Sequence, residues 1–171
     1  MPVRQIIHHP AQVLRRKARK VTAFTPELQN LIDDMVETMR EAPGVGLAAP
    51  QVDLSLRVIV VEYPEKEDAE DAPLKLYTVV NPEITRFSED SEVGPEGCLS
   101  IPGFAGDVER PYAVTVKGQN RQGKPIRIQA KGWLARIFQH EIDHLDGILF
   151  IDRAEKVWKL EEEGASAIAA D

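Results

Sequence analysis

The sequence predicts a single domain that mixes helices and strands, with a sheet that is at least partly antiparallel. Apolar residues recur at helical spacing in two segments, near residues 26–42 and 130–145. Two short apolar runs rich in β-branched residues, at 57–62 and 76–81, are typical of buried strands. At 113–130, two alternating runs flank the turn-forming NRQGK, which is the pattern of an antiparallel hairpin.

The length and composition suit one domain. The chain has 171 residues, of which 43% are apolar, and this is enough for an ordinary buried core. No internal repeat or linker divides it, so we expect one domain over residues 1–171, with 154–171 as a tail that is partly helical or frayed. The acidic, aperiodic segment 62–75 is expected to be a mobile solvated loop.

The first long helix has clear boundary signals. Thr25 is a suitable N-cap, Pro26 suits the first turn, and Pro43 follows the end of the pattern. A short helical segment is also expected at 10–18, and the second long helix should end near Gly147. The apolar stripe of the first helix predicts a buried face: Leu28, Leu31, Ile32, Met35, Val36 and Met39.

Charge and cysteine content limit the classes of function. The formal net charge is −7, which disfavours binding to nucleic acid. The basic cluster at 15–20 is interpreted as a solvated helix face, because it has no interleaved aromatic residues to stack on bases. We therefore expect no nucleic-acid binding. The single cysteine, Cys98, cannot form an internal disulfide, which favours a reducing compartment. The sequence has neither a signal peptide nor an apolar run long enough to cross a bilayer, which predicts a soluble cytoplasmic protein without membrane association.

The segment QHEIDHLDG, at 139–147, carries the strongest chemical signal. His140 and His144 are four residues apart on a predicted helix, so both imidazoles lie on one face and are able to bind one cation. Glu141 points about 100° away from His140, where it can reach a metal-bound water without being a ligand. This pattern favours a metal centre over a solvated helix face.

Two histidines leave a catalytic metal one protein ligand short of the usual three. Cys98, in PEGCLSIPG, is one candidate, because a turn between glycine and proline can present its thiolate. The glutamates 161–163 are the other, since they follow His144 at about the interval that one class of zinc proteases uses. The first choice is favoured, and substitution separates the two.

A third stretch, GVGLAAPQ at 44–51, links the first long helix to the first strand. Gly44 and Gly46 permit close approach of another backbone, and Gln51 offers an amide donor nearby. The stretch lacks the Lys and Ser or Thr of a phosphate-binding loop.

The three stretches together resemble the peptide deformylase family. GVGLAAPQ, EGCLS and HEIDH are similar to its three motifs, in its order and with its approximate spacings, and the resemblance extends over residues 1 to about 153. The chain departs from the family in the acidic insertion at 62–75 and in an acidic tail, where some bacterial members carry a basic one.

The resemblance implies an α+β fold, with mixed or antiparallel strands wrapped round the helix that carries the histidines. It also implies removal of the formyl group from the N-terminal formyl-methionine of new polypeptides, close to the ribosome, with release of formate. In this family Cys98, His140 and His144 would hold Fe(II), which Zn(II), Ni(II) or Co(II) can replace.

The remaining roles also come from the resemblance. Glu141 would be the general base, and the Gln51 amide and the Leu99 backbone N–H would stabilise charge on the formyl oxygen. The backbone at Val45 and Gly46 is similar to the edge along which the substrate peptide lies. Three side chains on the turns before His140 are candidates for the methionine pocket, with core packing as the alternative for the first and last: Trp133, Arg136 and Ile137.

Two other classes of protein share part of this pattern. A metalloprotease would use the two histidines and Glu141 with a tail glutamate, and has no use for Gln51 or Cys98. A non-catalytic metal-binding module would close the coordination shell with a fourth protein ligand. The two spare histidines, His8 and His9, are expected at the surface.

Overall fold

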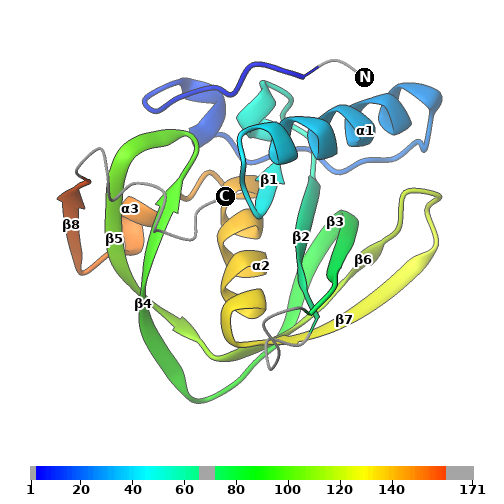
Figure 1. The fold of residues 1–171 in the computed structure, drawn as a ribbon. Coiled ribbons are helices and arrows are strands. Elements are labelled where there is room, and N and C mark those ends of the chain that lie inside the picture. Colours follow the sequence, from blue (N-terminus) through cyan, green and yellow to red (C-terminus); the bar gives the residue numbers. More distant parts are fainter. Residues whose placement is uncertain (1–2, 66–71, 161–171) are drawn as a thin grey trace.

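Two antiparallel sheets flank helix α2 (Gly132–Leu145) in the computed structural model of the chain, which describes residues 3–65 and 72–160. Figure 1 shows α2 between the two sheets, with α1 (Pro26–Glu41) above it. A short helix, α3 (Phe150–Arg153), follows α2. This arrangement confirms the expected α+β fold round the histidine-bearing helix.

The larger sheet has the strand order β1-β2-β3-β6-β7 and the smaller one β4-β5-β8. All six pairings between strands of the described residues are antiparallel, and β6 and β7 form the hairpin that the alternating runs predict. The strands are β1 (Gly46–Ala48), β2 (Val58–Pro64), β3 (Leu74–Phe87), β4 (Ser91–Cys98), β5 (Ile101–Pro111), β6 (Ala113–Gln119), β7 (Pro125–Lys131) and β8 (Lys156–Lys159).

Strand β2 is buried on both faces, which explains its unbroken apolar run. Ile59 and Val61 pack in the cluster between the larger sheet and α2, whereas Val58 and Val60 pack in the cluster that α1 covers. The predicted N-cap is present, because the Thr25 hydroxyl accepts a hydrogen bond from the Leu28 N–H at 3.2 Å.

The apolar side of α2 packs against the larger sheet. Its buried residues there include Leu134, Phe138 and Ile142, and the Phe138 ring meets the edge of Tyr77 at a centroid distance of 5.3 Å. Anchoring this side leaves the histidine side of α2 directed toward β4. A third cluster, with Val108 and Phe150, supports β4 and β5 from behind.

Three local predictions differ from the structure. Within 10–18 the only helix is a 3-10 turn at Gln12–Arg15, because the following N–H groups bond to distant carbonyls: Ala18 to Leu145 O at 2.7 Å and Arg19 to Ser55 O at 2.9 Å. The basic side chains at 15–20 are exposed, as expected, but most lie outside a helix. Part of the expected frayed tail is strand β8, which pairs with β5.

Strands β4 and β5 were not predicted from the sequence. Gly94, Pro95 and Gly97 interrupt the alternation that would reveal β4, yet it pairs with β5 from Ser91 to Cys98. The expected acidic loop at 62–75 is wrong at its ends, because 62–64 belong to β2 and 74–75 to β3, while residues 66–71 lie outside the described residues. Over residues 3–65 and 72–160, no helix is long and apolar enough to cross a membrane.

Candidate metal centre

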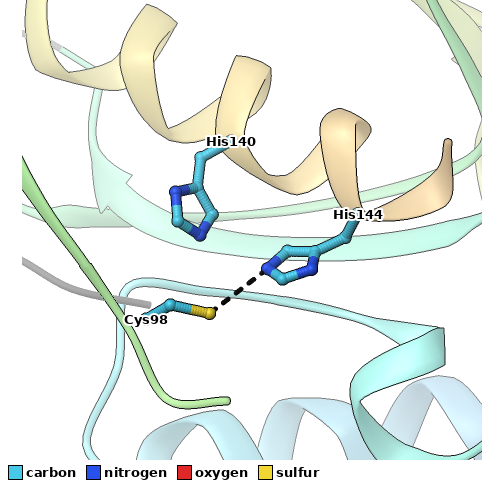
Figure 2. Close-up of side chains that lie close together, drawn as sticks. All are labelled: Cys98, His140 and His144. Atoms are coloured by element: carbon cyan, nitrogen blue, oxygen red, sulfur yellow. Dashed lines mark hydrogen bonds between the residues drawn. The ribbon is translucent and has the colours of Figure 1, made fainter. Parts of the chain in front are cut away.

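Cys98, His140 and His144 converge on one point between the two sheets. One potential ligand atom from each lies within 4.8 Å of the other two, and all three residues are buried. The Cys98 Sγ is 3.4 Å from the His144 Nε2, as drawn in Figure 2. One thiolate and two imidazoles are ligands for Zn(II) or Fe(II), so these residues fit a metal that needs three protein ligands.

Local structure accounts for this convergence. The four-residue spacing of the histidines on α2 brings their rings to a centroid distance of 5.0 Å. The thiolate arrives from the end of β4, where the pairing with β5 shifts register between Gly97 and Cys98. Such an irregularity redirects a side chain, and here it presents the thiol to the helix. The competing ligands, glutamates 161–163, lie outside the described residues.

Glu96, which the sequence reasoning missed, supports His140 from behind. Its carboxylate lies 2.9 Å from the His140 Nδ1 and accepts two hydrogen bonds from Arg110, at 2.7 and 2.8 Å. A carboxylate that accepts from Nδ1–H leaves the Nε2 lone pair for a metal. The sequence offered only one sign of this role, an acidic residue two positions before Cys98. It stands in a segment whose apolar and polar residues do not alternate as in a recognisable strand.

The surroundings of Glu96 keep it ionised. Burial raises its pKa, but the hydrogen bonds with Arg110 and His140 outweigh burial, and the pKa lies well below the ordinary 4.5. Burial likewise lowers the pKa of Arg110, and its bonds with Glu96 raise it above the ordinary value. Arg110 also donates to Asp143 at 2.7 Å, which extends the buried ionic network along α2.

The Glu141 carboxylate is fully buried beside the metal ligands. It packs against strand β1, where a Cβ atom added at Gly46 would lie only 2.7 Å from the Glu141 Oε2. The absence of a side chain at position 46 therefore gives this carboxylate its place.

The Gln51 side chain is fully buried, and its amide has a defined orientation. Its Oε1 accepts from the Ala48 N–H at 3.0 Å, while Nε2 donates to the Ser100 Oγ at 3.1 Å and faces the Cys98 Sγ at 3.7 Å. Because the Ala48 N–H is only a donor, the amide nitrogen must point toward Cys98. Leu99 lies in the turn between Cys98 and Ser100.

A pocket adjoins the predicted metal ligands. Its volume is about 20 Å³, which is room for roughly one water molecule. Helix α2 supplies five of its eight lining residues, β4 supplies two, and Val45 is the eighth. The lining residues are Val45, Glu96, Gly97, Trp133, Arg136, Ile137, His140 and Glu141. The structure therefore brings the predicted pocket side chains together with a predicted ligand and the predicted base.

Comparison with known proteins identifies relatives of this chain. Residues 3–159 match the family model described as polypeptide deformylase. The chain is 51% identical to the peptide deformylase of Desulforudis audaxviator, covering 95% of this chain and 100% of that protein. It is 46% identical to peptide deformylase 1 of Bacillus subtilis, over 95% and 96% of the two chains.

Solved structures agree with these sequence matches. The crystal structure of peptide deformylase from Thermotoga maritima superposes with a TM-score of 0.82 at 40% identity, covering 91% of this chain and 100% of that one. The enzyme from Synechococcus elongatus, in complex with actinonin, superposes with a TM-score of 0.81 at 42% identity over 91% and 81% of the chains.

Proposed function

The chain belongs to the peptide deformylase family, and we propose that Cys98, His140, His144 and Glu141 are the residues with which it performs the family's reaction. The enzyme is a metal-dependent hydrolase that removes the formyl group from the N-terminus of new polypeptides. The observation that carries the residue assignment is the convergence of three buried ligand atoms within 4.8 Å, beside a buried carboxylate and a pocket.

The Cys98 thiolate and the His140 and His144 imidazoles would hold Fe(II), which Zn(II), Ni(II) or Co(II) could replace. Such an ion would supply a nucleophilic water at neutral pH and withdraw electron density from the formyl oxygen. Glu96 holds the His140 ring with Nε2 toward this site.

Glu141 is the general base and acid. Its carboxylate takes a proton from the attacking water, whose oxygen bonds to the formyl carbon, and then gives that proton to the leaving nitrogen. The carbon–nitrogen bond breaks, formate is released, and the peptide keeps a free amine. Complete burial of Glu141 excludes bulk water, so the proton passes between defined partners.

Two donors from the protein stabilise charge on the formyl oxygen. The Gln51 Nε2 carries two hydrogens beside Cys98, and the backbone N–H of Leu99 follows Cys98 directly. The capture of Gln51 Oε1 by Ala48 prevents the amide from turning its acceptor toward the reacting oxygen.

The substrate peptide lies extended along Val45 and Gly46. Strand β1 is the terminal strand of its sheet, a position where an extended peptide can add as a further strand through main-chain bonds. The methionine side chain enters the pocket formed by Trp133, Ile137 and the aliphatic stem of Arg136.

We assign the reaction to one domain that works in the cytoplasm near the ribosome, where new polypeptides carry their formyl group. A metalloprotease is the weaker reading, because Cys98 and Gln51 lie at the centre. A closed structural metal site is also weaker, since the cluster found within residues 3–65 and 72–160 has three ligands and Glu141 borders the pocket.

A formate-release assay combined with elemental analysis tests the proposal. Protein purified without oxygen should contain about one divalent metal per chain and release formate from formyl-Met peptides, and it should leave internal peptide bonds intact. Metal-loaded protein that cleaves internal bonds, or that releases no formate, would contradict the assignment.

A further inference from the structure

Arg136 connects the substrate pocket to the metal centre. It lies on α2 one turn before His140, and its side chain is one wall of the pocket. Despite its charge it is 7% exposed, and its guanidinium carbon lies 5.3 Å from the centre of the Trp133 ring. A long, flexible cation in this place needs several bonds to hold one position.

The guanidinium group is held by the strands behind the pocket. Its Nη1 donates to the Glu96 Oε2 at 2.8 Å and to the Val108 carbonyl at 2.8 Å, and its Nη2 donates to the Glu92 carbonyl at 2.8 Å. These bonds fix the end group on β4 and β5, which also holds in place the aliphatic stem that runs to it from α2.

Glu96 contacts the arginine and the histidine through different oxygen atoms. Oε2 accepts from Arg136, while Oε1 lies 2.9 Å from the His140 Nδ1. One rigid carboxylate therefore joins a wall of the pocket to a predicted metal ligand. Arg110 also binds both oxygens, so removal of Arg136 leaves Glu96 paired but less constrained.

Gly94 provides the space that this arrangement needs. A Cβ atom at position 94 would lie 3.1 Å from both the Arg136 Cζ and Nη2. Those atoms cannot yield freely, because the guanidinium bonds to Glu96 and to two carbonyls at once.

We propose that Arg136 is a positioning residue, which acts through Glu96 on His140 and makes metal retention depend on the state of the pocket wall, with Gly94 as its required neighbour. The proposal rests on the proposed function only for the identity of the metal ligands. Arg136 touches no reacting atom in this scheme, and its stem alone contacts the substrate.

The test compares Arg136→Met, Arg136→Lys and Gly94→Ala with the unmodified chain. Methionine keeps much of the wall but loses the charge, so we expect metal to pass to a chelator about 10-fold faster. Lysine keeps the charge, but its donors are all on one nitrogen and cannot span the acceptors that two guanidinium nitrogens reach, so its release rate should be intermediate. Gly94→Ala should speed release by less than Arg136→Met, with every ligand intact.

Two further readouts separate positioning from general damage. The absorption spectrum of the Co(II)-loaded protein should change in Arg136→Met, since it reports the geometry of the ligands. In a Glu96→Gln background, adding Arg136→Met should give little further increase in metal release, because both act through one group. Arg121→Met is the matched control: this arginine also joins two elements, through Gln29 and Asp33, away from the pocket.

Three results would overturn the proposal: an unchanged release rate and Co(II) spectrum in Arg136→Met with only KM raised, additive effects with Glu96→Gln, or equal metal loss in Arg121→Met. If Arg136→Met does not fold, Gly94→Ala decides, and wild-type retention in that variant rejects the idea. Metal release is measured without turnover, so failure of the deformylase assignment would appear separately, in the formate assay.

Discussion

The Glu141 carboxylate occupies space that only a glycine at position 46 leaves open, because an added Cβ would come within 2.7 Å of Oε2. We expect Gly46→Ala to push this carboxylate away from the metal ligands. A displacement of about 1 Å lowers turnover by roughly 10²-fold. Bound metal, measured by elemental analysis, should remain because the three atoms nearest the added Cβ all belong to Glu141 and none to a predicted metal ligand. Turnover near the unmodified rate would show that Glu141 has another workable position.

Glu141→Gln tests the base directly. The amide keeps the size of the carboxylate but accepts no proton, so the variant should retain its metal and lose about 10²- to 10⁴-fold in formate release. The measurement is the rate of formate release from a formyl-Met peptide in fixed-time assays, normalised to bound metal. A rate close to that of the unmodified chain would remove Glu141 from the mechanism.

The third metal ligand can be assigned by substitution. Cys98→Ala should abolish tight metal binding, whereas a chain that ends at Leu160 should keep its metal, because it lacks glutamates 161–163 but retains strand β8. Ending the chain at Arg153 would be a poorer comparison, since it removes β8 and its pairing with β5. Metal retained in Cys98→Ala and lost from the shortened chain would favour the protease assignment.

The identity of the metal should appear in its response to air. One thiolate and two imidazoles suit both Zn(II) and Fe(II), and the family resemblance favours iron. We expect the activity of the Fe(II) form to decay in air, the Ni(II) form to persist, and the Zn(II) form to be slower, since tetrahedral zinc resists a further ligand. The measurement is turnover per bound metal for three forms of one apo preparation. Equal rates that are indifferent to oxygen would contradict a special role for iron.

The ion pair between Arg40 and Glu62 predicts a pH-dependent contribution to stability. Hydrogen bonds from Arg40, at 3.0 and 2.7 Å, lower the pKa of Glu62 below its ordinary 4.5 and outweigh the effect of partial burial. A depressed folded-state pKa means that the pair stabilises the fold above that ordinary value. The stabilisation is lost as the pH falls through the lower, folded-state pKa.

Arg40→Met should therefore reduce the free energy of unfolding at pH 7, by about 0.2–1 kcal/mol for a pair this exposed. The difference from the unmodified chain should shrink in acid, and the control Arg40→Met/Glu62→Gln should show little of this pH dependence. Chemical denaturation at several pH values measures it. A difference that is the same at neutral pH and in acid would mean that lost packing, not charge, explains the effect.

Much of the architecture and many of the candidate site residues could be predicted from the sequence. The α1 stripe, the β6–β7 hairpin and the helical spacing of His140 and His144 depend on local periodicity, which short-range geometry sets directly. The convergence of Cys98 with these histidines was also expected, since the motifs resemble a known family. Strands β4 and β5 were not predicted, because glycine and proline interrupt the alternation of apolar and polar residues. These strands are held by backbone hydrogen bonds to each other, which the side-chain pattern does not reveal.

The sequence by itself determined the two long helices, the β6–β7 hairpin and the candidate ligands, because each depends on residue types at fixed local spacing. Only the tertiary structure decided how those ligands are supported. Glu96, Arg110 and Arg136 are far apart in sequence and have no shared motif, yet they form one buried network on β4, β5 and α2. Buried charges are tolerated only when each one is paired with an opposite charge. That pairing depends on how whole helices and strands pack together, which no local sequence pattern encodes.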